Sequence, residues 1–354
     1  MWKGTLTKGR PDPQPRSYGK PAADAPDSAP KPGRQEGVLS TLAVLVAAGT
    51  LGATALAALA RHVWIADLLV HFRLQYAAAA FAAAVLLALR RRVVWAVAAV
   101  LACLVNVYAA APVLGWAWPP EATAVGSTRA EAAPATELRI VTLNVFYRSD
   151  SHARVADFIR TAHADAVVLT EVTPEWRREL QVLRTDFPFE FFSGDAHERG
   201  VLLLSRLPLS QAEVVPAFSD DEPPLLATLL AGERTLRVLG VHASWPMLPA
   251  DAEQRNRQLR QLARLTRDSR EPLVVLGDLN ISPFSPHFQA LLADGGLRSA
   301  AENRGWQPTW PSFLPPLGIQ IDHALVSPGV RVRDFQVGPS VGSDHRAVIV
   351  DLAL

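Results

Sequence analysis

The sequence predicts an α/β sandwich preceded by about three transmembrane helices, and two observations lead to this fold class. Three long apolar stretches lie before residue 119, although charged residues still make up 19% of all 354 residues. After residue 137, short runs of aliphatic and β-branched residues alternate with helix-like segments. Such alternation is typical of domains in which helices cover sheets.

Charge and cysteine content exclude several classes of protein. The 35 basic and 34 acidic residues give a net charge of +1, so the chain as a whole is neither a strongly basic nucleic-acid binder nor an acidic disordered protein. Cys103 is the only cysteine, which rules out an internal disulfide.

Residues 1–36 have the composition of a tail. They are rich in Pro, Gly, Lys, Asp and Ser and contain almost no large aliphatic side chain. Such a segment cannot bury enough apolar surface to offset the entropy of ordering it. We therefore expect a disordered tail.

The apolar stretches predict membrane spans at about 37–60, 68–89 and 93–118. About 20 apolar residues cross the hydrocarbon core, and the first and third stretches contain 24 and 26 uncharged residues. The second has only 16 uncharged residues, at 74–89, so it spans the bilayer only if it begins near Leu68.

Three polar residues at the start of the second span, Asp67, His71 and Arg73, cluster at one helix end. We expect them to be anchors in the membrane interface rather than an ion pathway. Charged residues are otherwise absent from the spans, which argues against a transporter.

The basic residues predict the orientation in a cell membrane. Seven lie in residues 1–36 and three at Arg90–Arg92, whereas the loop between the first two spans has only Arg61 and Arg73. The positive-inside rule then makes the tail cytoplasmic and everything after residue 118 extracytoplasmic. Without the second span, the topology would invert.

Residues 119–136 are rich in Pro, Ala and Thr and are expected to form a linker, followed by one domain at 137–354. That domain contains 22 Arg, no Lys and 27 Asp plus Glu, a net charge of 22 − 27 = −5. Strands are expected at 138–145, 166–172, 201–204, 225–230, 235–241, 273–276, 321–326 and 347–352, and helices at 153–162, 174–183 and 251–267.

Polar residues stand at the ends of most predicted strands. They are Asn144, Glu171, His242, Asp278, Asn280, Asp322, Asp344 and His345. Each alone is more typical of a turn or cap. Together, beside consecutive apolar runs, they favour one active site at an edge of the sandwich.

These motifs resemble the endonuclease/exonuclease/phosphatase superfamily. The matching segments are TLNV (142–145), LTEV (169–172), RGVLLLSR (199–206), GVH (240–242), GDLNISPFS (277–285), IDHALVS (321–327) and GSDHRAV (342–348). The resemblance implies a four-layer, DNase I-like α/β sandwich. The three spans, with HFRLQY at 71–76, also look like a membrane-anchored bacterial branch. Thr170 and Ala347 depart from the Gln and Pro that the family often has there.

The resemblance implies hydrolysis of a phosphate ester with Mg²⁺, or Mn²⁺ in its place. Glu171 would hold the cation, with Asn144 beside it and Asp344 completing the shell. Carboxylate oxygens suit this role because Mg²⁺ prefers hard oxygen ligands.

The same resemblance assigns the catalytic groups. Asp278 would accept the proton of the attacking water, and Asn280 would orient that water and the phosphate. His242 and His345 would stabilise the charge on the phosphoryl oxygens, and Asp322 would orient His345.

The substrate stays open at this point. Asn280, Arg199 and Trp306 are expected to contact it. A phosphodiester of nucleic acid or of a phospholipid head group is expected, but the net acidic domain does not favour nucleic acid. Arginines at 255, 257, 260, 264, 267 and 270 are expected on a solvated helix face, with docking to an anionic surface as the alternative.

Three further alternatives remain: a phosphomonoesterase of the same fold, a non-catalytic membrane-anchored binding module, and a zinc hydrolase using His242, Asp278 and His345. The zinc site lacks a His-x-x-x-His or Cys cluster. No protein partner can be inferred.

Overall fold

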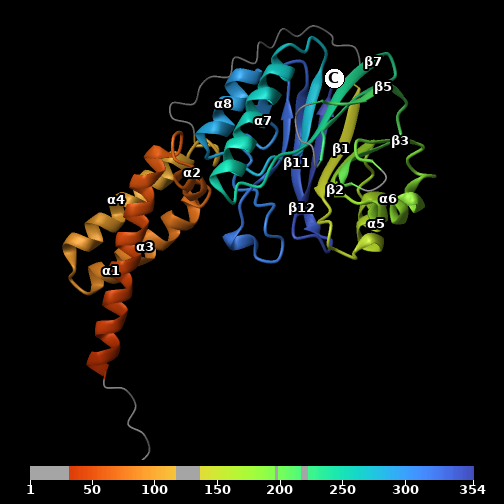
Figure 1. Cartoon of the computed structure of the whole chain (residues 1–354). Coiled ribbons are helices and arrows are strands. Elements are labelled where there is room, and N and C mark those ends of the chain that lie inside the picture. Colours follow the sequence, from red (N-terminus) through yellow and green to blue (C-terminus); the bar gives the residue numbers. More distant parts are fainter. Residues whose placement is uncertain (1–31, 117–135, 196–197, 217–221) are drawn as a thin grey trace, which may run out of the picture.

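A computed structural model describes residues 32–116, 136–195, 198–216 and 222–354 (Figure 1). Most of the predicted tail and nearly all of the predicted linker lie outside these ranges. The described part consists of an N-terminal group of helices and a sandwich of two sheets with helices on both sides.

The N-terminal helices are α1 (Pro32–Leu56), which continues as a 3-10 turn, α2 (Trp64–Val70), α3 (Arg73–Leu89) and α4 (Val93–Ala110). The segments Gly37–Leu59 and Val93–Ala110 are each long and apolar enough to cross a membrane, and α2 with α3 could form a third span bent by 68°. The second predicted span is therefore broken between α2 and α3.

Alanines form the contacts among these helices. Ala47, Ala83 and Ala99 are buried where α1, α3 and α4 meet, because small side chains let helices approach closely. Large aliphatic and aromatic side chains such as Leu45 and Phe81 point outward and are exposed. This distribution is the one expected of helices that face lipid.

The C-terminal domain contains two six-stranded sheets. The first has the order β11 (Arg331–Ser340), β12 (Arg346–Ala353), β1 (Glu137–Asn144), β2 (Ala166–Val172), β4 (Gly200–Ser205), β3 (Phe189–Phe192). The second has the order β5 (Leu209–Val214), β6 (Leu225–Ala231), β7 (Arg234–His242), β8 (Leu273–Asp278), β10 (Asp322–Val326), β9 (Arg298–Ser299). The β1–β2 and β7–β8 pairs are parallel, and the others are antiparallel.

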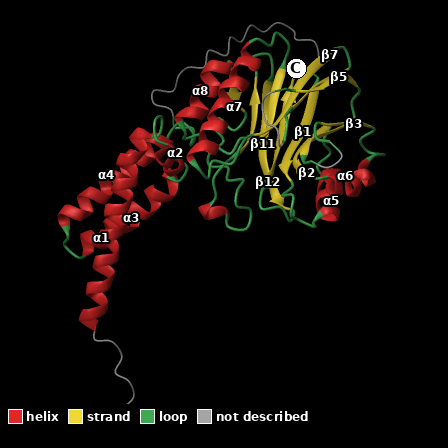
Figure 2. Cartoon of the chain, in the orientation of Figure 1, coloured by secondary structure: helices red, strands yellow, loops and turns green. Residues whose placement is uncertain are grey.

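The sheets pack face to face, and helices cover their outer faces (Figure 2). Alternate strand residues, for example Ile140 and Val238, fill the space between the sheets. The helices α5 (His152–Thr161) and α6 (Pro174–Glu179) cover the first sheet, and α7 (Pro249–Arg267) and α8 (Pro286–Gly295) cover the second. The predicted four-layer α/β sandwich is confirmed.

Strand register gathers the polar residues at one edge. His242 pairs with Asp278 across the parallel β7–β8 ladder, and Asp322 pairs with Asp278 across the antiparallel β10–β8 ladder. Gly277 has a φ of 136°, and a Cβ there would lie 1.9 Å from the carbonyl oxygen of Val241. Only glycine therefore allows β8 to run beside β7 up to Asp278.

The junction between the helices and the sandwich corrects two predictions. Asp67 and His71, expected to be interfacial anchors, are buried against the sandwich, where Asp67 pairs with Arg255. Arg255 accordingly lies on the inner face of α7 and is 1% exposed, not on a solvated face. Its neighbours Arg257 and Arg260 are exposed and pair with Glu253.

Candidate active site

Asp278 lies at the centre of the polar edge. It ends β8 and is 1% exposed. Its Oδ1 accepts the backbone N–H of Asn280 at 2.8 Å, and its Oδ2 accepts the amide of Asn144 at 3.1 Å. The Nε2 atoms of His242 and His345 each lie 3.7 Å from Oδ2. Both imidazoles therefore converge on one carboxylate oxygen.

His345 is held by a buried carboxylate. Its Nδ1 lies 2.9 Å from Oδ2 of Asp322, so Nε2 is the nitrogen directed into the site. Burial lowers the pKa of His345, but the charges of Asp322 and Asp278 outweigh it and raise that pKa to about 9. Conversely, the charge of His345 holds the pKa of Asp322 below its ordinary value despite burial. The pair is an imidazolium–carboxylate at neutral pH.

His242 is held in the same way by Glu222, a residue that no sequence motif indicated. Nδ1 of His242 lies 2.7 Å from Oε2 of Glu222, and Oε1 of Glu222 accepts the backbone N–H of Glu171 at 2.5 Å. Burial lowers the pKa of His242, but the charges of Glu222, Asp278 and Glu171 raise it to about 10. Glu222 precedes β6 in a run of acidic and proline residues, so no apolar strand pointed to it.

The pKa of Asp278 is raised, whereas those of Glu171 and Asp322 are lowered. Burial and the charge of Asp322 raise its pKa to about 6, although His345 and His242 act in the opposite direction. It is therefore ionised at neutral pH but remains a better proton acceptor than an ordinary aspartate. A pKa near the working pH suits a general base.

Glu171 lies on the solvent side of Asn144. Its φ of 60° is left-handed, and its carboxylate accepts the Tyr147 N–H and the Asn144 amide, each at 3.0 Å. Burial raises the pKa of Glu171, but the charge of His242 and these donors bring it below its ordinary value. Asn144 turns its amide oxygen to the Phe146 N–H, so its nitrogen faces both Glu171 and Asp278.

Asn280 follows Asp278 in a left-handed conformation, with a φ of 49°. Its side-chain amide donates to the carbonyl oxygen of Ala243 at 2.9 Å and lies 3.4 Å from Nε2 of His242. Asn280 is thus beside one imidazole and bonded to the central carboxylate.

The oxygen-rich donor set fits a divalent cation. Asp278, Asp322 and His345 each have a possible ligand atom within 4.8 Å of the others, but a charged His345 cannot bind a cation, which leaves the two carboxylates. Among the described residues, Oδ1 of Asp322 and Oδ1 of Asp344 are buried without a hydrogen-bond partner. Buried oxygens without a donor are suited to a cation. Glu171, partly accessible at 14%, can also reach an ion from the solvent side.

A cavity of about 220 Å³ opens beside His242 and Glu222. Arg199, a predicted substrate contact, lines it, and its guanidinium also stacks on Tyr147 at 4.5 Å. Trp310, a tryptophan that was not among the predicted site residues, contacts Asp344. Nε1 of Trp310 donates to Oδ2 of Asp344 at 3.2 Å. Trp306 is half-buried in the same loop and has no hydrogen bond to a site residue within the described ranges.

Comparisons with known proteins identify the family of this chain. The model of the endonuclease/exonuclease/phosphatase family matches residues 141–345, which is more than half of the chain. The chain belongs to this family. It is a family of nucleases, phosphodiesterases and phosphatases, and divalent-metal dependence is general in it.

Solved structures share the fold of this family member. An endonuclease/exonuclease/phosphatase from Beutenbergia cavernae is 24% identical with a TM-score of 0.52, covering 62% of this chain and 72% of that chain. Humanized D. rerio TDP2 is 17% identical with a TM-score of 0.52, covering 61% and 99% of the two chains. A conserved protein from Enterococcus faecalis is 17% identical with a TM-score of 0.51, covering 61% and 99%. A search of curated proteins found no match.

Proposed function

We propose that this chain is a membrane-anchored, Mg²⁺-dependent phosphodiesterase. The observation that carries the proposal is the convergence of two imidazoles on Asp278, with Nε2 of each 3.7 Å from the same oxygen. That separation is longer than a hydrogen bond, so the two N–H groups and the carboxylate oxygen can each bind a water molecule or phosphoryl oxygen that lies beside them. Phosphodiester hydrolysis needs a base and cationic donors at such a place.

Each residue of the site has a separate role in the proposed reaction. Asp278 accepts the proton of the attacking water, and Asn280 orients that water through its amide. His242 and His345 donate from Nε2 to the non-bridging oxygens, where negative charge grows in the transition state. Glu222 and Asp322 hold these imidazoles in the charged form and in the correct orientation.

A divalent cation would be held on the Glu171 side of the site, with Asp344 completing its shell. When bound, it would neutralise the charge of the phosphate and act as a Lewis acid. The amide of Asn144 bridges Glu171 and Asp278 and so keeps two carboxylates together. We propose Mg²⁺ because the ligands are oxygens.

A phospholipid head group is the substrate we favour, because exposed apolar side chains flank the site. We call them the apolar rim: Trp245, Met247, Leu248, Phe313, Leu314 and Leu317. Trp245 is 62% exposed and lines the cavity beside His242. Phe313, 78% exposed, follows Ser312, whose N–H donates to the carbonyl oxygen of Asp344. Large exposed apolar groups favour contact with a membrane.

The loop that carries Phe313 also contacts the N-terminal helices. Gln75, near the start of α3, donates to the carbonyl oxygen of Gly318 at 2.8 Å. With α3 in the bilayer, the apolar rim would lie at the membrane surface.

Nucleic acid is the alternative substrate, as a D. rerio TDP2 structure was solved with a single-strand DNA product. The charge of −5 on residues 137–354 argues against it. We further propose that the domain is extracytoplasmic.

The test uses the full-length chain in phospholipid nanodiscs. We expect Mg²⁺-dependent hydrolysis of bis-p-nitrophenyl phosphate, abolished by chelator, and much slower hydrolysis of the monoester p-nitrophenyl phosphate. The reverse order of rates would instead establish a phosphomonoesterase. Equal rates with Mg²⁺ and with chelator would refute the metal dependence.

A second assay separates lipid from nucleic acid. Phe313→Ser together with Leu317→Ser should lower hydrolysis of a nanodisc phospholipid severalfold while leaving the soluble diester unchanged. Cleavage of single-stranded DNA faster than of any phospholipid would contradict the lipid proposal.

A further inference from the structure

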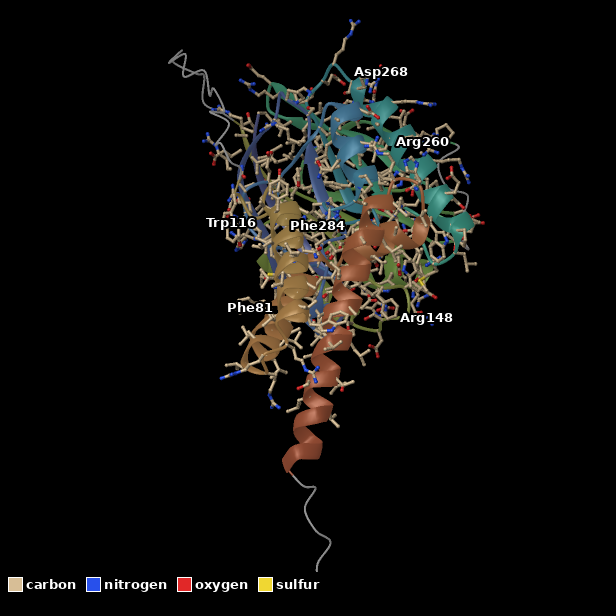
Figure 3. The ribbon with its side chains drawn as sticks, turned by 90° about the vertical axis from the view of Figure 1, so that its left-hand side faces the viewer. Phe81, Trp116, Arg148, Arg260, Asp268 and Phe284 are labelled. Atoms are coloured by element: carbon tan, nitrogen blue, oxygen red, sulfur yellow. The ribbon has the colours of Figure 1, made fainter. Side chains whose placement is uncertain are left out.

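A buried polar cluster joins the membrane-proximal helix α2 to the catalytic domain. We call Asp67, His71, Arg255, Ser282 and Ser285 the α2 joint. Each of them is less than 5% exposed. Figure 3 shows Phe284, which packs against the apolar side of this junction, where the N-terminal helices reach the sandwich. Charged groups in such a place need a function or a partner.

Asp67 uses both carboxylate oxygens in the α2 joint. Oδ2 accepts Nη2 of Arg255 at 2.5 Å, and Oδ1 accepts the hydroxyl of Ser285 at 2.5 Å. Directly after the end of α2, Nδ1 of His71 lies 2.8 Å from the hydroxyl of Ser282. These contacts connect residues more than 180 positions apart in the sequence.

Arg255 carries the connection to the active site. Its Nη1 donates to the backbone carbonyl oxygen of Asn280 at 3.1 Å. Asn280 has the left-handed φ of 49°, which asparagine adopts more readily than other non-glycine residues, and this conformation sets the direction of its carbonyl group. The backbone N–H of Asn280 also donates to Oδ1 of Asp278. Arg255 therefore holds the peptide that places the amide of Asn280 beside His242.

Asp67 is the charged partner that orients Arg255, together with the neutral Oδ1 of Asn256, which accepts from Nε at 3.0 Å and from Nη2 at 2.9 Å. It is the only carboxylate that pairs with Arg255 in the described part of the chain. Both side chains are almost fully buried, at 1% and 2% exposure. Removing one partner of such a pair leaves a buried charge without compensation. Ser285, the other partner of Asp67, caps α8 at the end of the same loop.

We propose that Asp67 is a positioning residue: through Arg255 and Ser285 it fixes the catalytic loop 278–285, so that the membrane-proximal helix completes the active site. The isolated residues 137–354 would lack this support. The structural part of the proposal stands independently, while its effect on turnover rests on the proposed function.

The first test follows backbone hydrogen exchange in full-length protein in nanodiscs. Asp67→Asn should speed exchange of the amides at 279–285 by about tenfold or more, because the loop loses its charged support. Amides of α5, on the far side of the sandwich, should keep their wild-type rates. Asp157→Asn is the matched control, since Asp157 is 74% exposed. Wild-type exchange at 279–285 in Asp67→Asn would overturn the proposal, whatever the protein hydrolyses.

The second test separates positioning from folding. With bis-p-nitrophenyl phosphate, Asp67→Asn should lower kcat on the order of 10- to 100-fold and leave KM within about twofold. The double variant Asp67→Asn/Arg255→Met removes the uncompensated charge, so its Tm should recover. Its kcat should stay low because the Asn280 carbonyl still lacks its donor. Recovery of kcat together with Tm would show a merely structural role. Absence of turnover in the wild type would instead refute the proposed function, with the exchange result unaffected.

Discussion

The two imidazoles of the active site are held by carboxylates of different origin. Asp322 belongs to β10 and pairs in register with Asp278, whereas Glu222 comes from the loop before β6. Both place an oxygen within 2.9 Å of Nδ1 and raise the pKa of their imidazole. Glu222 additionally binds the backbone of Glu171. The loop carboxylate thus couples its imidazole to the backbone of Glu171, whereas the side chain of Asp322 makes no hydrogen bond to Glu171 in the described part of the chain.

Among the substitutions that test this comparison, removal of either imidazole should have the largest effect on kcat. His345→Gln and His242→Gln should each lower kcat by about 10²- to 10³-fold, the range for loss of one transition-state donor. The initial rate of soluble diester hydrolysis measures this. His163→Gln, at an exposed position, is the control. If one of the two substitutions left kcat unchanged, the two imidazoles would not act on the same phosphate.

Neutralising the carboxylates should distinguish the two pairs. Asp322→Asn and Glu222→Gln should each lower kcat on the order of 10- to 100-fold, as loss of an orienting carboxylate does. Only Glu222→Gln should also raise the Mg²⁺ concentration needed for half-maximal activity, because it loosens the backbone of Glu171. Rates measured across a Mg²⁺ titration test this. The same Mg²⁺ dependence in both variants would remove the difference between the pairs.

The pH dependence follows from the pKa values of the three central groups. Activity should rise as pH increases through about 6, where Asp278 loses its proton, and fall above about 9, where His345 and then His242 lose theirs. The folded pKa values of both histidines are above 6.5, so the stability they add is complete below pH 6.5 and is lost as pH rises through 9 to 10. A kcat/KM profile across pH 5–10 tests the prediction for activity, and Tm values over the same range test the prediction for stability. A rate that is flat from pH 5 to 10 would contradict the assignment.

The smallest effect is expected at Trp310. Trp310→Phe removes the 3.2 Å hydrogen bond to Asp344 but keeps the ring, so the apparent Mg²⁺ affinity should change by about threefold. Trp306→Phe, where no hydrogen bond to the site is broken, is the paired control. A larger change for Trp306→Phe would instead support the predicted contact of Trp306 with the substrate.

Sequence patterns were sufficient for the groups that strands position. Asn144, Asp278 and Asp322 stand at the ends of buried runs, and the register of parallel and antiparallel ladders brings such ends together. Patterns were insufficient where a loop or a surface strand carries the information. Glu222 follows no apolar run, and β11 alternates weakly and contains Gly338 and Pro339, so neither was predicted.

The α2 joint was missed for a different reason. Asp67 at the end of an apolar stretch is typical of an interfacial anchor, and Arg255 in a row of arginines is typical of a solvated face. Each interpretation is reasonable alone. Only the tertiary structure brings the two charges together, 188 positions apart.

The central claim is that Asp278, between two charged imidazoles, is the base of a metal-dependent phosphodiesterase. The most direct measurement is kcat for bis-p-nitrophenyl phosphate with Mg²⁺, comparing full-length wild type, Asp278→Asn and the surface control Asp157→Asn. We predict turnover for wild type and control, and a loss of about 10²- to 10⁴-fold for Asp278→Asn. Wild-type turnover retained by folded Asp278→Asn would contradict the claim.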